Sequence, residues 1–125
     1  MAGISLFVSA IMILTVLYIS VVERTQEIGV IKAIGGRNKD IRRIFVSESF
    51  LIGLFSGLLG VGIAALLSAI GNVAVERIFG TTILHMTPTY ALLGILASVI
   101  ISVIAGVFPA NKAAKLDPIE ALRHD

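Results

Sequence analysis

Hydrophobic residues fall in three long runs, which are separated by two polar segments and followed by a polar tail. The runs cover about residues 4–22, 46–70 and 88–108, the segments 23–45 and 71–87, and the tail 109–125. A helix of about 20 residues crosses the hydrocarbon core of a bilayer, so each run is long enough to do so. The pattern predicts an all-α polytopic membrane protein with three transmembrane helices.

The first run begins so close to Met1 that a cleaved signal peptide is the alternative interpretation. A signal peptide carries basic residues ahead of its apolar part and a small-x-small cleavage site after it. Neither is present, and the run ends instead in Glu23 and Arg24. We therefore expect a retained transmembrane helix.

The segment 23–45 has a helical pattern of its own. Four aliphatic residues recur at the spacing of an amphipathic helix. Gly35 and Gly36 follow and predict the end of that helix. Asn38 is expected to cap a new helix that leads into the second run. The aliphatic residues of the short helix are Ile28, Val30, Ile31 and Ile34.

Basic residues are unevenly distributed between the polar parts of the chain. The segment 23–45 holds six of the ten Lys and Arg residues, the tail 109–125 holds three, and the segment 71–87 holds only Arg77. Positive charge beside a span favours the cytoplasmic side. This asymmetry predicts a cytoplasmic loop 23–45, a cytoplasmic tail and an outer loop 71–87, in a protein of the inner (cytoplasmic) membrane.

Composition excludes several classes of protein. The chain is 57% hydrophobic and 14% charged, whereas soluble domains are about 45–50% apolar and about 25% charged. The absence of cysteine excludes disulfides and metal thiolates. No aromatic residues alternate with the basic ones, so the net charge of +2 suggests contact with lipid headgroups and no nucleic-acid partner.

The sequence contains no motif that predicts catalysis or cofactor binding. There is no GxxxxGK[ST] phosphate loop, no HExxH, no GxSxG and no pair of carboxylates at catalytic spacing. His85 has no partner at metal-ligand spacing. We therefore expect a protein that is not an enzyme and binds no cofactor or metal. Glu48, near the start of the second run, is expected to reach the interface or to pair with Arg42 or Arg43.

Small residues line the second run in two stripes. Gly53 and Gly57 form a GxxxG pair, and a neighbouring stripe contains Ser56, Gly60, Ala64 and Ser68. Small side chains allow helix backbones to approach closely in lipid. We predict helix packing at Gly53, Gly57 and Gly60.

Three stretches together carry a resemblance to a known family. ERTQEIGVIKAIGG, IRRIFVSESFLIGLFSGLLG and FPANKAAKLDPIEALR occur in this order and resemble the C-terminal membrane region of FtsX-like (MacB-type) permeases of ABC transporters. The third stretch matches the proline-alanine tail motif of that family at Pro109, Ala110, Ala113, Ala114 and Pro118. The resemblance implies that the loop 23–45 forms a coupling helix that contacts an ATPase, through Glu23, Arg24, Thr25, Glu27, Ile28, Gly29, Ile31, Lys32, Gly35 and Gly36.

The resemblance implies a permease module of an ABC transporter. A separate ATPase subunit would bind ATP, and a second permease copy or the remaining permease half would complete a dimer in the lipid membrane. A subunit that transmits ATPase movement to a cell-wall hydrolase or sensor is the alternative, and a membrane-packing protein without an ATPase partner is a third. Family members carry a further transmembrane helix and an extracytoplasmic domain ahead of this region, so we expect a fragment or a split subunit whose substrate is handled elsewhere.

The charge asymmetry predicts which loop can be labelled from outside the cell. The chain has no cysteine, so a thiol reagent reports only on an introduced one. In intact cells, Thr82→Cys should react with a membrane-impermeant reagent and Asn38→Cys should react only after permeabilisation. The reverse pattern would contradict the orientation.

Overall fold

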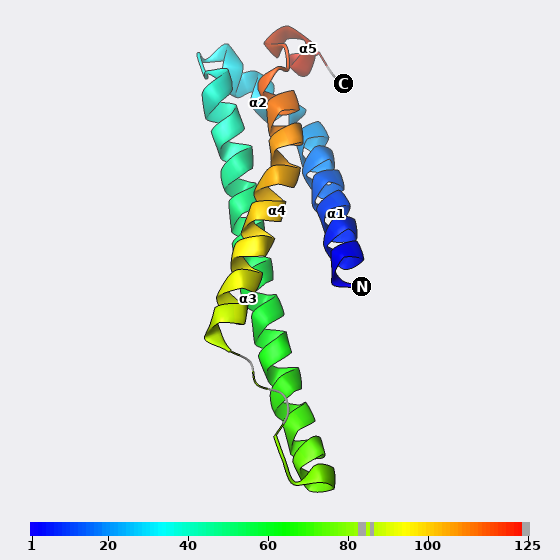
Figure 1. Cartoon of the computed structure of the whole chain (residues 1–125). Coiled ribbons are helices and arrows are strands. Elements are labelled where there is room, and N and C mark those ends of the chain that lie inside the picture. The colour runs from blue at the N-terminus through cyan, green and yellow to red at the C-terminus, as the bar shows by residue number, and fades with distance from the viewer. Residues whose placement is uncertain (83–84, 86, 124–125) are drawn as a thin grey trace.

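The computed structural model describes residues 1–82, 85 and 87–123 and consists of helices (Figure 1). The described residues contain no strand. Three helices are long and apolar enough to cross a membrane, which confirms the predicted all-α membrane fold. The helices are α1 (Ala2–Glu23), α2 (Thr25–Ala33), α3 (Asn38–Phe79), α4 (Pro88–Ala114) and α5 (Pro118–Leu122).

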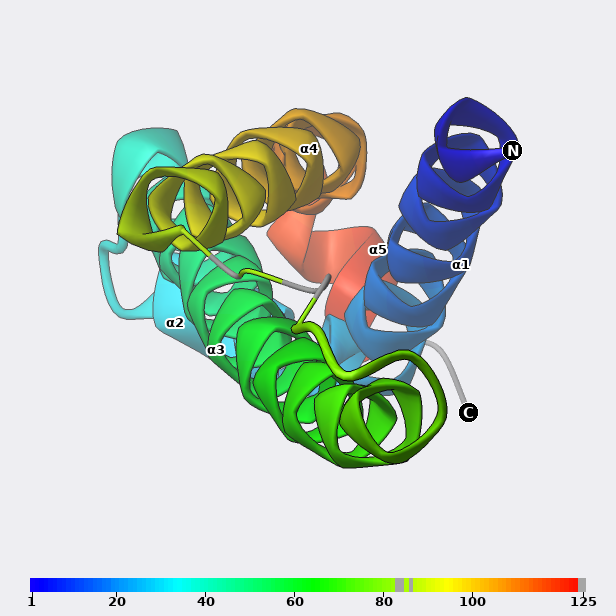
Figure 2. The same ribbon diagram turned by 60° about the horizontal axis from the view of Figure 1, so that its bottom comes forward.

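Helix α4 is the centre of the bundle. It packs along α3 and also contacts α1, whereas α1 and α3 scarcely touch each other. Figure 1 shows α4 between the other two long helices, with α2 and α5 side by side across one end of the bundle, and Figure 2 shows the same helices from the opposite end of the structure. That end, which we call the α2 end, therefore brings together the last turns of α1 and α4 and the first turns of α3.

Small residues allow α3 and α4 to approach closely. Each helix contributes three of them at intervals of four residues, which places them on one face. A Cβ atom added to Gly53 would lie 2.8 Å from the Cα of Val99, and one added to Gly106 would lie 1.7 Å from Ser49 Oγ. The two helices are therefore packed backbone to backbone. The residues are Ser49, Gly53 and Gly57 on α3 and Ser98, Ser102 and Gly106 on α4.

Two serines of α4 add hydrogen bonds to this contact. Ser102 Oγ donates to the carbonyl oxygen of Ser49 at 2.6 Å, and Ser98 Oγ donates to the carbonyl oxygen of Gly53 at 2.9 Å. Ser49 and Ser102 are fully buried. Such hydrogen bonds between membrane helices contribute about 0.6 kcal/mol each on average. The sequence interpretation did not identify the small residues that α4 contributes to this contact, although their four-residue spacing is visible in the sequence.

The glycines that were predicted to pack differ in their surroundings. A Cβ at Gly57 would lie 3.0 Å from the Cα of Ile95, whereas a Cβ at Gly60 would meet no atom within 4 Å. The second predicted stripe, which includes Ser56 and Ala64, is exposed or half-buried. Among the described residues, the stripe that contains Gly53 and Gly57 is the one packed tightly against α4.

Two helices extend further than their apolar runs. Helix α3 continues through the predicted outer loop to Phe79, and Gly80, with φ of 69°, ends it. Its 42 residues correspond to about 63 Å at about 1.5 Å per residue, twice the thickness of a hydrocarbon core. Helix α4 continues past Pro109, which the sequence interpretation placed at its end. Both expectations were wrong. An isolated glycine such as Gly71 is tolerated within a helix, and Pro109, which is buried, is tolerated where α4 packs against other helices.

The start of α3 was predicted to within one residue. Arg37, rather than Asn38, is the N-cap of α3: its backbone N–H donates to the Asp40 carboxylate at 3.2 Å. The carboxylate in the first turn thus satisfies the backbone N–H of the N-cap residue itself. Thr87 precedes α4, with Pro88 at the first position of that helix.

The hydrophobic core of the described residues is a single cluster at the α2 end. It joins the last turns of α1, the inner face of α2, the first turns of α3 and the end of α4. Ile31, Val46 and Leu116 pack around it half-buried. The core thus lies where the short helix meets the long ones. Its buried members are Val21, Ile28, Ile41, Phe45, Ala110 and Ala113.

The α3–α4 contact predicts opposite results for two glycine substitutions. Gly57→Leu should lower the thermal unfolding midpoint in detergent micelles, because overpacking a tight contact costs about 1–3 kcal/mol. Gly60→Leu, the matched control, should leave the midpoint close to that of the unmodified chain, since its side chain would enter open space. Equal midpoints for the two variants would contradict the packing described here.

Candidate coupling site at the α2 end

Helix α2 is held rigidly to the end of α1. Arg24 ends α1 and starts α2, with φ of −96° and ψ of 17°. Thr25 Oγ1 donates to the carbonyl oxygens of Val21 at 3.1 Å and Val22 at 2.8 Å. These bonds tie the side chain of Thr25 to carbonyls in the last turn of α1. Thr25, one of the predicted coupling residues, therefore serves the junction between the two helices.

Arg24 also connects this junction to α3. Its guanidinium Nη1 lies 3.7 Å from Oε2 of Glu48, and that oxygen is buried without a hydrogen-bond partner among the described residues. The sequence interpretation had Glu48 reach the interface or pair with Arg42 or Arg43, whereas the pair formed is Arg24–Glu48. Arg24 is distant from Glu48 in the sequence, and the two residues meet because the end of α1 lies beside the third turn of α3.

The end of α2 requires both glycines of the predicted turn. The N–H of Gly36 donates to the carbonyl of Ile31 at 2.8 Å, and that of Gly35 donates to the carbonyl of Lys32 at 3.1 Å. These two bonds form a Schellman motif, in which Gly35 adopts φ of 101°. A Cβ at Gly36 would lie 2.5 Å from Ile31 Cγ2. The predicted helix end is confirmed, and one glycine is needed for its φ and the other for space.

The inner face of α2 is occupied by the chain itself. Ile28 is 3% exposed and belongs to the core cluster, and Ile31 packs half-buried against that cluster. The family resemblance implied that Ile28 and Ile31 contact an ATPase. The side chain of Ile28 is instead buried within this chain, in the core cluster with residues of α1, α3 and α4.

Helix α5 covers a second part of α2. A Cβ added to Gly29 would lie 2.9 Å from the Cβ of Ala121, which is 2% exposed. Asp117 caps α5 by accepting a hydrogen bond from the N–H of Ile119 at 2.9 Å. The side chain of Ile119 itself is 77% exposed.

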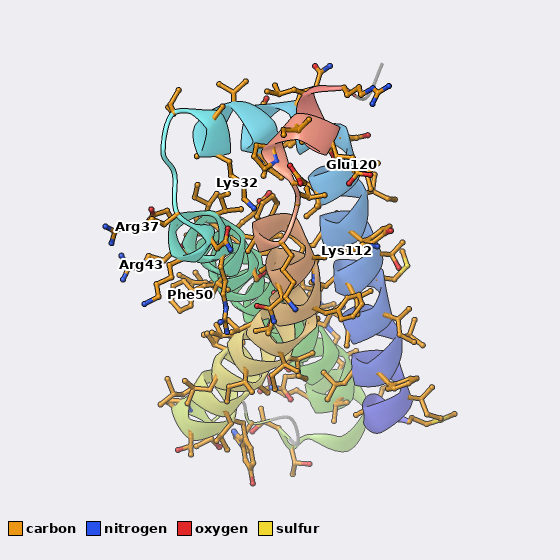
Figure 3. All side chains as sticks on the ribbon, turned by 90° about the horizontal axis from the view of Figure 1, so that it is seen from above. Lys32, Arg37, Arg43, Phe50, Lys112 and Glu120 are labelled. Atoms are coloured by element: carbon orange, nitrogen blue, oxygen red, sulfur yellow. The ribbon has the colours of Figure 1, made fainter. Side chains whose placement is uncertain are left out.

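Lys32 joins α2 to the end of α4. Its Nζ donates to the carbonyl oxygen of Ala114 at 2.7 Å and also to the carbonyl oxygen of Leu116. Figure 3 shows Lys32 extending from α2 toward α4, whereas Arg37 and Arg43 point away from the bundle. Lys32, carried over as an ATPase-coupling residue, is therefore engaged within the chain.

The opposite face of α2 is exposed. At about 100° per residue, two positions of α2 and its C-cap residue fall within about 60° of one another around the helix axis. Val30 is 50% exposed and Ile34 is 81% exposed, and Glu27 beside them is also exposed. We call Glu27, Val30 and Ile34 the outer face of α2. Of the other predicted coupling residues, Glu23 and Arg24 are exposed at the N-terminal side of this face.

Comparison with known proteins identifies relatives along almost the whole chain. The model of the FtsX-like permease C-terminal family matches residues 1–118. The uncharacterized ABC transporter permease YknZ of Bacillus subtilis is 42% identical over 132 residues. The macrolide export ATP-binding/permease protein MacB of Psychrobacter cryohalolentis is 41% identical over 125 residues, and an uncharacterized ABC transporter permease of Methanocaldococcus jannaschii is 37% identical over 123 residues.

These relatives are much longer than the chain. Each match covers at least 98% of the chain, but only 30% of YknZ, 18% of MacB and 31% of the Methanocaldococcus protein. The similarity therefore concerns the membrane region described here. Within residues 1–82, 85 and 87–123, no group of three or more His, Cys, Asp or Glu side chains could hold a metal ion.

Proposed function

The chain belongs to the FtsX-like permease family, and we propose that it couples ATP hydrolysis on an ATPase to movement of its own membrane helices. The ATPase would dock on the outer face of α2. Movement of α2 would then be passed to the long helices and used for export or for work outside the membrane.

One observation carries this proposal: α2 is fixed to all three long helices on one side and exposes aliphatic side chains on the other. A free loop gains nothing from apolar residues such as Val30 and Ile34 in water, since each loses about 1.5–3 kcal/mol relative to burial. A partner that covers the outer face would recover that free energy. It would also act on an element that packs against the ends of the long helices.

The names of the relatives support an ATPase as the partner. MacB is named as an ATP-binding and permease protein in one chain, whereas YknZ is named as a permease alone. The sequence of the present chain contains no GxxxxGK[ST] motif. We therefore assign ATP binding to a partner chain or domain, which docks at Glu27, Val30 and Ile34.

The proposal also includes the membrane, the orientation and the neighbouring subunit of the chain. We place it in the cytoplasmic membrane with α2 and α5 inside the cell, because the segment 23–45 holds six of the ten basic residues. A second permease copy or the remaining permease half would lie beside it. The long helices leave room for one, since only 11–17% of their most apolar windows is buried within the chain.

The length of α3 favours a second candidate function, transmission of ATPase movement to a hydrolase or sensor outside the membrane. Its 42 residues make a helix about 63 Å long, and its far end continues past the start of α4 (Figure 1). A rigid helix of this length could transmit force beyond the bilayer. Purification of the complex with its outer partner would decide, because a hydrolase partner favours this second function over export.

Docking on the outer face predicts a difference between two matched substitutions. Ile34 and Ile78 are similarly exposed, at 81% and 74%, and lie at opposite ends of the molecule. Ile34→Asp should weaken ATPase binding about tenfold to a hundredfold, because one buried isoleucine contributes about 1.5–3 kcal/mol. Ile78→Asp should have no effect.

ATPase co-purification from membranes and detergent extraction should be measured together for both variants. Loss of the ATPase with normal extraction for Ile34→Asp alone supports docking. Equal ATPase recovery with Ile34→Asp and Ile78→Asp would contradict it. Ile28→Asp is unsuitable for this test, because Ile28 lies in the core and its replacement would disturb the fold.

A further inference from the structure

Lys32 lies on the inner side of α2 and is only partly exposed. Its ammonium group donates to the carbonyl oxygens of Ala114 and Leu116, which belong to the last residue of α4 and the linker that follows it. The residues joined by the first bond are 82 positions apart in the chain. Lys32 therefore makes a long-range contact, and the chemistry of that contact explains why a lysine is suited to it.

The end of α4 attracts a cation. The last four carbonyl groups of a helix have no partner within the helix, and together they carry about half a negative charge. A lysine ammonium has three donor hydrogens, enough to serve two carbonyls at once. The lysines of α4's own end do not fill this role: Lys112 Nζ donates to Tyr18 Oη at 2.7 Å, and Lys115 is exposed.

A second contact joins the same parts of the chain one turn away on α2. Gly29 lies against Ala121 of α5 so closely that an added Cβ would be 2.9 Å from the alanine Cβ. Lys32 and Gly29 are three residues apart and thus lie on the same side of α2. Together, Lys32 and Gly29 contact both ends of residues 114–121, the segment that leads from α4 into α5.

This contact matters because α4 has no direct chain connection to α2. Helix α1 leads into α2 through Arg24, and α2 leads into α3 through a short turn at 34–37. Helix α4, the centre of the bundle, therefore depends on tertiary contacts to respond to α2. Among the described residues, these contacts include the packing of Ala110 and Ala113 in the core cluster and the hydrogen bonds of Lys32.

We infer that Lys32 is a positioning residue that fastens α2 to the C-terminal end of α4, so that a displacement of α2 moves α4 directly. The inference rests on the proposed function for the source of the displacement, an ATPase docked on the outer face. It gives Lys32 a role within the chain in place of the contact with the ATPase that the family resemblance implied.

Amide hydrogen exchange of the whole chain in detergent micelles tests the fastening without any partner. Lys32→Met should raise the exchange of the amides of Lys115, Leu116 and Ala121 by about tenfold or more, because it removes charge-assisted hydrogen bonds and frees the segment to open. Lys32→Arg should restore protection, since a guanidinium also donates to two carbonyls. Lys39→Met, on an exposed lysine of α3, is the matched control and should change nothing.

A steric variant reaches the same segment by another route. Gly29→Val should also raise exchange at Ala121, because its side chain would displace α5. Gly3→Val, where an added Cβ meets no atom within 4 Å, is its control. Unchanged exchange in α1 shows that the fold is retained. Unaltered protection at Lys115, Leu116 and Ala121 in Lys32→Met would overturn the fastening, as would failure of Lys32→Arg to restore it.

A third arm tests transmission in the complex with the ATPase. Addition of a non-hydrolysable ATP analogue should change the exchange of α4 in the unmodified complex, and Lys32→Met should abolish this change while the ATPase remains bound. A full α4 response in Lys32→Met would overturn transmission through Lys32. If the unmodified chain bound no ATPase, the proposed function would fail and transmission with it, whereas the exchange of the isolated chain would still decide the fastening.

Discussion

The burial of Ile28 among the ends of the three long helices is the interaction on which the rest of the arrangement depends. Within a bilayer, apolar side chains gain little by leaving lipid for protein, so the hydrophobic effect cannot hold helices together there. At the α2 end, where polar segments begin, it can. The core cluster of the described residues lies at this end, and Ile28 brings α2 into it. The short helix is thereby made part of the bundle.

The remainder of the bundle is held by close approach instead of apolar burial. Gly106 lies directly against Ser49, and the serine hydroxyls of α4 donate to carbonyls of α3. This contact aligns α4 with α3, so that the last turn of α4 lies next to α2. Lys32 can therefore reach Ala114. Packing in lipid and the polar contact at the α2 end are parts of one arrangement, in which the central helix ends at the element proposed to receive the ATPase.

Local signals in the sequence predicted most of the helices, whereas most contacts between helices could not be predicted from them. The apolar runs and the glycine turn at Gly35 follow from neighbouring residues and were correct. The direction of Ile28 and the partner of Glu48 depend on where distant helices lie, so periodicity indicated an amphipathic α2 without showing which face was covered. The extension of α3 past Gly71 was missed because the apolar run ends there, although a helix tolerates an isolated glycine.

The central claim is that α2 and the end of α4 move as one body. Because the chain has no cysteine, spin labels can be attached at Ala33→Cys and Lys115→Cys alone, both of which are exposed positions. A second labelled pair, at Ile78 and Thr89, reports on the other end of α3 and α4. Pulsed electron paramagnetic resonance on the ATPase complex should give one narrow Ala33–Lys115 distance that is the same with and without bound nucleotide, while the Ile78–Thr89 distance changes. A broad Ala33–Lys115 distribution, or one that shifts when nucleotide binds, would contradict the account.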